Sequence, residues 1–155
     1  MFDNAIRGRL NAYFLAAMDG YMHGKYSDLK TRMFEKAPPV LVEIGPGTGA
    51  NFRYLPKGTR VIAVEPNRRM HPLLRRRARQ RGIELDLREV DGERLDVPSA
   101  SVDFVCSSLV LCTVTEPGKV VAEVLRVLRD GGRFACIEHV AAPAGCGLLL
   151  GVAEL

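Results

Sequence analysis

The chain has 155 residues, a length that suits a single domain with its own buried core. Its 47% hydrophobic and 26% charged residues are ordinary for a soluble globular protein. The longest apolar stretch near the C-terminus, residues 147–153, is too short to span a bilayer. The low aromatic content, with no Trp, argues against an interface built on aromatic stacking.

The net charge of +4 is unevenly placed, because seven arginines lie between residues 68 and 81. A basic run of this kind can bind nucleic acid or an anionic membrane. This run has no interleaved aromatic residues, so the sequence favours a solvated helix face and argues against nucleic acid as a partner.

The four cysteines form no CxxC pair and have no metal-ligand spacing with histidine, so no metal site is predicted. Three of them lie in or beside apolar, strand-like runs, where a free cysteine behaves as a small hydrophobic residue. The first residues lack the apolar stretch of a signal peptide. Together these features predict a soluble protein of the reducing cytoplasm.

The first part of the chain, residues 4–36, has apolar residues at helical spacing and is expected to form helices with one break. The second helix is expected over residues 27–34, with Ser27 as its N-cap. Pro38 and Pro39 then end the helical region.

From residue 40 onward, predicted strands and helices alternate. The predicted strands are residues 40–44, 60–65, 83–90, 102–111 and 133–140, the fourth ending near Cys106 or Ser107. The predicted helices are residues 68–81, closed by Gly82, and a segment that starts at Pro117 and has its apolar face at Val120, Val121, Val124, Leu125 and Leu128. Residues 130–132 are read as a turn.

Alternation of strands rich in Val and Ile with amphipathic helices is typical of parallel βαβ units. Right-handed crossovers then predict an α/β fold with a doubly wound, Rossmann-like parallel sheet of order 3-2-1-4-5. In such a sheet the binding crevice lies at the carboxyl ends of the strands, where the winding direction switches.

The most informative motif is EIGPGTG, residues 43–49, placed between a predicted strand and a predicted helix. Glycines there let the backbone turn sharply and approach a ligand closely. The spacing alone is ambiguous, because Gly45, Gly47 and Ala50 also satisfy the dinucleotide fingerprint. The acidic Glu43 favours a ligand with a cationic ammonium and sulfonium, since a pyrophosphate site gains nothing from a carboxylate.

Two further acidic positions follow predicted strands. Glu65 ends the second strand, where a carboxylate can accept hydrogen bonds from both ribose hydroxyls of an adenosine ligand. Asp91 and Gly92 follow the third strand. Asp91 could accept from an adenine amino group, but a plain Asp-Gly turn is an equally good interpretation.

These motifs and those around them resemble the class I S-adenosylmethionine-dependent methyltransferases. The motifs LVEIGPGTG, VIAVEPN, VDGERLDVPSASVDFVCSSLVLCTV and VLRVLRDGGRFACIEHV follow that class in order and spacing over residues 39–142. Within it, GTGANFRYLP, VEPN, SVDFV, LVLCTV and IEHVAA look most like the thiol S-methyltransferases of the methyltransferase-like seven group, with ubiquinone and menaquinone methyltransferases as wider kin.

The resemblance implies S-adenosylmethionine as cofactor and a small thiol or a lipophilic or quinol molecule as methyl acceptor. The implied cofactor contacts are Glu43, Gly45, Gly47, Gly49, Glu65, Pro66, Asp91, Gly92, Glu93, Ser107 and Leu109. A hydroxyl acceptor would also need a base, for which the candidates at the crevice are Glu138, His139 and Cys112.

The resemblance also implies a sixth strand and an antiparallel seventh, and the fifteen residues after Val140 do not continue the family pattern. We therefore expect an N-terminal helical cap (1–36), a cofactor-binding core (37–142) and a short tail (143–155). Strand five would form a bare apolar edge open to self-association. Two other functions remain open: a cofactor- or partner-binding remnant without turnover, and a nicotinamide-dependent oxidoreductase.

Overall fold

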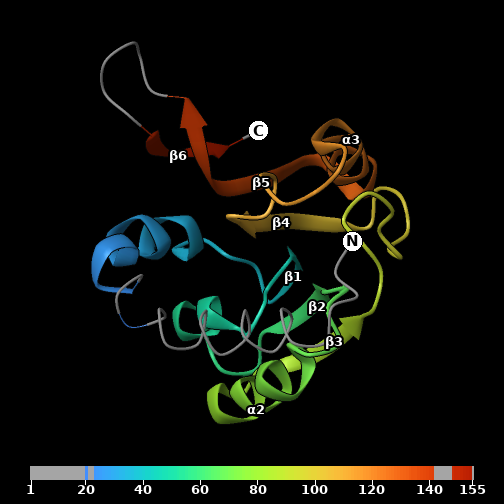
Figure 1. Ribbon diagram of the computed structural model, residues 1–155. Coiled ribbons are helices and arrows are strands. Elements are labelled where there is room, and N and C mark those ends of the chain that lie inside the picture. The colour runs from blue at the N-terminus through green and yellow to red at the C-terminus, as the bar shows by residue number, and fades with distance from the viewer. Residues whose placement is uncertain (1–19, 21–22, 142–147, 155) are drawn as a thin grey trace.

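The computed structural model describes residues 20, 23–141 and 148–154, with side chains described for residues 20 and 23–138. Its centre is a six-stranded sheet of order β3-β2-β1-β4-β5-β6 (Figure 1). The strands are β1 (Val40–Ile44), β2 (Arg60–Val64), β3 (Glu84–Arg88), β4 (Val102–Ser108), β5 (Leu128–Ala141) and β6 (Leu148–Glu154). The helical elements are the 3-10 turn η1 (Ala50–Tyr54), α2 (His71–Arg81), α3 (Pro117–Val127) and a helix over residues 23–34.

The predicted parallel order 3-2-1-4-5 is confirmed. Strand β1 pairs in parallel with both β2 and β4, and β3 and β5 extend the sheet on either side, also in parallel. The chain winds outward from β1 to β3 and then returns to β4 on the other side of β1. The switch point of the sheet therefore lies between β1 and β4, at the carboxyl ends of those strands.

Each face of the sheet has its own apolar core, because alternate residues of a strand point to opposite faces. On one face Leu41 of β1 packs with Phe52 of η1, Leu74 of α2 and Phe34 of the helix over residues 23–34. On the other face Val42 and Ile44 of β1 pack with the buried valines of α3, which are Val120, Val124 and Val127. Leu125, predicted to face this core, is 59% exposed instead.

Some predicted boundaries differ from the structure. The helix over residues 23–34 begins before Ser27, so Ser27 is not its N-cap. Helix α2 begins at His71, not at residue 68, and ends as predicted at Gly82, whose φ is 68°. The element after the glycine motif is the five-residue turn η1 and not an α-helix. Its short length agrees with Pro56 and Gly58, which follow at once and favour a turn.

The predicted turn at residues 130–132 lies inside β5. The pairing register moves from Val102↔Leu128 to Phe104↔Arg133, so extra residues are accommodated on β5. Gly131 has a φ of 78°, a conformation common at such bulges. The chain therefore leaves the ladder locally and does not end the strand.

The prediction that strand five forms a bare edge was wrong. Strand β6 pairs antiparallel with β5 from Ala135↔Glu154 to Ala141↔Leu148. The segment predicted as a short tail thus supplies a strand, as its apolar run LLLGVA allows once β5 offers unpaired backbone groups. The edge on which self-association was predicted is occupied by the chain's own β6.

Within the described residues, no helix combines the length and the apolar character that crossing a membrane requires.

Candidate functional site

The glycine motif forms a loop that turns sharply between β1 and η1. Gly45, Gly47 and Gly49 all have positive φ, between 57° and 81°. A Cβ on Gly45 would lie 2.5 Å from Cγ2 of Val110, so this glycine lets the loop after β4 pack against the motif. A Cβ on Gly47 would meet no protein atom within 4 Å. Gly47 is therefore the glycine of the motif whose backbone a ligand can approach.

Glu43 lies in β1 next to this loop, with 1% of its surface exposed. Its Oε1 accepts a hydrogen bond from Nδ2 of Asn51 at 2.7 Å, and the same amide group donates to Oγ of Ser108 at 3.2 Å. Oε2 of Glu43 and Oδ1 of Asn51 are buried acceptors without a hydrogen-bond partner. Two buried acceptors without a donor, on residues that are hydrogen-bonded to each other, suit a ligand that brings N–H groups or positive charge.

Burial determines the acidity of Glu43. Loss of hydration raises the pKa of its carboxyl from 4.5 to about 7, and the hydrogen bond from Asn51 and the charge of Lys30 lower it only in part. The nearby carboxylate of Glu65 also raises it. A cationic ligand next to Glu43 would favour the ionised carboxylate and so gain a charge-assisted contact.

Glu65 follows β2 and joins that strand end to the glycine loop. Its Oε2 accepts from the backbone N–H of Gly47, and its Oε1 accepts from the N–H of Asn67, both at 2.9 Å. Burial raises the pKa of this carboxyl, and the two backbone hydrogen bonds oppose that rise. Each carboxylate oxygen retains a second acceptor position, so the predicted ribose hydroxyl contacts are compatible with this geometry.

The segment after β3 adopts the turn that the sequence allowed. Oδ1 of Asp91 accepts from the N–H of Glu93 at 3.1 Å, an Asx turn, and Asp91 itself is exposed. A Cβ on Gly92 would lie 2.9 Å from Cγ2 of Ile44, so Gly92 is required for packing against β1. Oε1 of Glu93 accepts hydrogen bonds from the N–H groups of Thr115 and Glu116, which directly precede α3.

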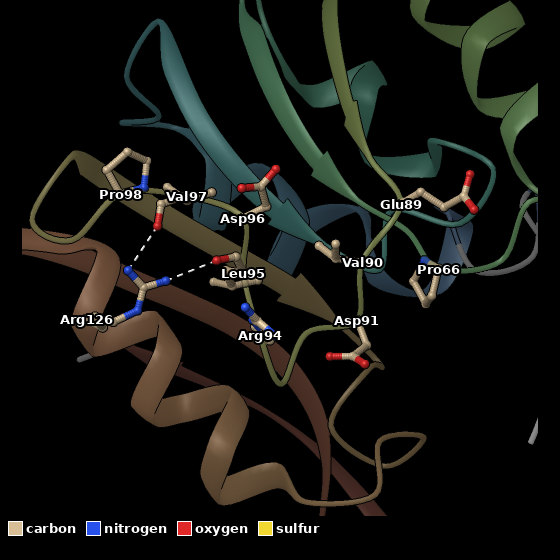
Figure 2. A pocket seen from close by; sticks show the side chains of 10 residues that line it. All are labelled: Pro66, Glu89, Val90, Asp91, Arg94, Leu95, Asp96, Val97, Pro98 and Arg126. Carbon is tan, nitrogen blue, oxygen red and sulfur yellow. Dashed lines mark hydrogen bonds between the residues drawn. The ribbon is translucent and has the colours of Figure 1, made fainter.

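A pocket of about 780 Å³ opens beside this turn. Figure 2 shows Pro66 and Asp91 toward one end of it, with Arg126 of α3 bonded to the carbonyl oxygens of Leu95 and Val97. The remaining lining residues are Glu89, Val90, Arg94, Asp96 and Pro98. Pro66 and Asp91 are predicted cofactor contacts, so the pocket adjoins the predicted adenosine side of the site.

The remaining predicted residues lie at the ends of β4 and β5. Ser107 is fully buried, and its Oγ lies 3.4 Å from Oε1 of Glu138. Leu109 has a φ of 58°, unusual for a residue with a side chain. Exposed Cys112 donates from Sγ to the carbonyl oxygen of Leu109 at 3.7 Å. His139 belongs to β5, but its side chain lies outside the described residues.

The structure thus brings Glu43, the glycine loop and Glu65 into one connected group. The sequence-based prediction missed Asn51, which donates to Glu43, and Ser108, which accepts from the same amide group. The available signal was a polar Asn between Ala50 and Phe52. Its meaning depends on the approach of Ser108, which is distant in sequence.

Comparison with known proteins places this geometry in a family. The family model described as "Methyltransferase domain" matches residues 42–136, from within β1 to within β5. The human thiol S-methyltransferase TMT1A is 38% identical over 136 residues, which cover 83% of this chain and 56% of that protein. A phosphatidylethanolamine N-methyltransferase of Cereibacter sphaeroides is 30% identical over 107 residues, covering 68% of this chain and 53% of that protein.

Solved structures agree on the fold. A SAM-dependent methyltransferase from Aquifex aeolicus superposes with a TM-score of 0.58 at 18% identity, covering 70% of this chain and 60% of that one. The chain spans between half and three fifths of the length of the curated relatives named above. The family implies S-adenosylmethionine as cofactor, and the buried acceptors of Glu43 and Asn51 and the open approach to Gly47 fit it. The matched family model, which covers more than half of the chain, and the 38% identity to a curated methyltransferase over 83% of this chain show that this protein belongs to the S-adenosylmethionine-dependent methyltransferases.

Proposed function

We propose that this chain binds S-adenosylmethionine at the carboxyl ends of β1, β2 and β3 and takes part in methyl transfer to a small molecule. The observation that carries the proposal is the pair of buried, partnerless acceptors, Oε2 of Glu43 and Oδ1 of Asn51, beside the glycine loop. A pyrophosphate would add negative charge next to Glu43, and the sulfonium and ammonium of S-adenosylmethionine would add positive charge. This favours the methyltransferase over a nicotinamide-dependent oxidoreductase.

The bound cofactor would supply a methyl group that its sulfonium activates, so the protein acts chiefly by orienting the cofactor and the methyl acceptor. In this proposal Gly47 lets the backbone approach the ligand and Glu65 accepts from the ribose. Glu43 and Asn51 accept hydrogen bonds from the amino group of the ligand. None of these roles needs a proton to move during the reaction.

A thiol is the acceptor that this proposal favours. A thiol reacts as its thiolate and needs only an environment that tolerates that anion, whereas a hydroxyl acceptor needs a positioned base. Glu138, a candidate base, already accepts two backbone N–H groups through Oε1. The similarity to the human enzyme named a thiol S-methyltransferase supports the same acceptor class, and the lipid-modifying relative keeps a lipophilic or quinol acceptor as the second candidate.

The test is a calorimetric titration of the chain with S-adenosylhomocysteine and, separately, with NADH. Binding of the first and not the second is expected. NADH binding without S-adenosylhomocysteine binding would refute the proposal. A panel of thiols, phenols and quinols with labelled S-adenosylmethionine then tests turnover. Cofactor binding without transfer to any of them would indicate a binding remnant, a function that the chain's partial coverage of its relatives makes worth testing.

Replacing Glu65 with alanine is expected to weaken S-adenosylhomocysteine binding by about 1.5–3 kcal/mol, the usual size of hydrogen bonds to a charged group. The variant loses the ribose acceptor and also the contact that holds the N–H of Gly47. Calorimetry measures the effect. Glu84→Ala is the matched control, because exposed Glu84 is the first residue of β3 and so lies at the end of the sheet opposite to Glu65. Equal affinity of the Glu65 variant and the wild type would remove the ribose assignment.

A further inference from the structure

The segment that follows β4 forms a strained wall of the site. Leu109, in the left-handed region at φ 58°, donates its N–H to the carbonyl oxygen of Ile137 at 2.8 Å. A residue with a Cβ is disfavoured in this region and keeps it only when neighbouring contacts impose it. The contacts that impose it must therefore come from the structure around residues 109–111.

Glu138 of β5 supplies those contacts. Its Oε1 accepts from the N–H of Val110 at 2.9 Å and from the N–H of Leu111 at 3.1 Å. The residue is 7% exposed, so both hydrogen bonds are largely shielded from water. A carboxylate that accepts two consecutive backbone N–H groups fixes the direction of the chain at that point.

The wall that Glu138 fixes touches the glycine loop. The side chain of Val110 occupies the space into which a Cβ of Gly45 would point, 2.5 Å from Cγ2. Leu109, one residue earlier, is among the residues expected to contact the cofactor. Displacement of residues 109–111 would therefore change both the packing of Gly45 and the lining of the site.

We propose that Glu138 is a positioning residue that holds residues 109–111 against the glycine loop and so maintains the shape of the cofactor site. The inference rests on the proposed function, because the site that it shapes is the one for S-adenosylmethionine. It assigns Glu138 a role as hydrogen-bond acceptor, in place of the role as base that the sequence suggested. The role requires an oxygen at the position of Oε1 that accepts from the N–H groups of Val110 and Leu111, in addition to the longer contact from Oγ of Ser107, and it does not require a negative charge.

Two variants distinguish the effect of the length of the Glu138 side chain from the effect of its charge. Glu138→Gln keeps the length of the side chain and an oxygen that can accept both N–H groups, and loses the charge. Glu138→Asp keeps the charge and withdraws the oxygens by one methylene. We expect the Gln variant to bind S-adenosylhomocysteine within about threefold of wild type, and the Asp variant to bind about tenfold more weakly. Hydrogen exchange at the amides of Val110 and Leu111 in the ligand-free protein should accelerate in the Asp variant and not in the Gln variant.

The control is Val61→Ala, which removes methyl groups from a fully buried position of β2 and lowers stability. Val61 lies in the core on one face of the sheet, whereas Val110 and Leu111 pack against the core on the other face. Its affinity is expected to match wild type, so weak binding of Glu138→Asp cannot be assigned to lost stability alone. The proposal is overturned if Gln binds more weakly than Asp, or if both bind like wild type. It is also overturned if the Gln variant binds but loses turnover that the wild type shows, since that result indicates a base. Failure of the wild type itself to bind would refute the proposed function instead.

Discussion

Replacing Glu43 with glutamine is expected to remove the loss of stability that this buried carboxyl causes as the pH rises from about 4.5 to 7. Burial raises the pKa of the folded-state carboxyl to about 7 from 4.5, so the folded protein binds this proton more tightly than the unfolded chain. Below pH 4.5 the carboxyl is protonated in both the folded and the unfolded state, so the two states bind the same number of protons and stability does not change with pH through this group. As the pH rises to 7, the folded state is progressively destabilised, by on the order of 3 kcal/mol at the end of the range.

Urea denaturation at pH 5 and at pH 7 measures this effect. The free energy of unfolding of the wild type should fall from pH 5 to pH 7 because Glu43 ionises. The free energy of unfolding of Glu43→Gln should fall much less over the same range. Glu35→Gln is the control, because Glu35 is exposed at the end of the helix over residues 23–34. Parallel behaviour of Glu43→Gln and wild type would show that the buried carboxyl does not titrate in this range.

The same substitution tests the cofactor site. A cationic ligand next to Glu43 stabilises the ionised form, so wild-type binding of S-adenosylhomocysteine should strengthen as the pH rises from 5 to 7. Over this range the amino group of the ligand stays largely protonated. Glu43→Gln should bind about tenfold or more weakly at pH 7 and lose this dependence on pH. The substitution is thus expected to stabilise the empty protein and weaken the complex, a combination typical of functional sites.

The sequence predicted the sheet because its signals are local. Each of β1 and β2 is a short run of buried apolar residues followed by a turn, and the alternation with helices permits few topologies. The features that it missed depend on distant contacts. Strand β6 forms where β5 offers it a partner, and the bulge at Gly131 follows from the register with β4.

For the candidate site, too, the sequence predicted the local features and missed those that depend on distant contacts. Glu43, the glycines and Glu65 were placed together because parallel strands end at one edge of a sheet. The sequence could not show which glycine faces open space, since that depends on Val110 approaching Gly45 from the end of β4. It also could not show that Glu138 is held by backbone N–H groups, because those belong to a loop that adopts a left-handed conformation at Leu109.

Replacing Gly47 with valine is expected to abolish S-adenosylhomocysteine binding while leaving the protein folded. Gly47 has a φ of 57°, and a Cβ there would meet no protein atom within 4 Å. The free energy of unfolding should therefore fall only by the cost of placing a side chain in the left-handed region, about 1–2 kcal/mol. The valine would instead fill the space through which the ligand reaches the backbone. Calorimetry gives the binding and urea denaturation gives the stability.

Gly58→Val is the matched control for this experiment. Gly58 also has a positive φ, 83°, and a Cβ there also meets no atom within 4 Å. It lies before β2, at the end of the sheet opposite to Glu65, so it shares the backbone strain of Gly47 and not its place beside the predicted ligand. Both variants should lose similar stability, and only Gly47→Val should lose binding. If Gly47→Val bound like wild type, the glycine loop would not contact the ligand, and the reason for placing a cofactor between Glu43 and Glu65 would be gone.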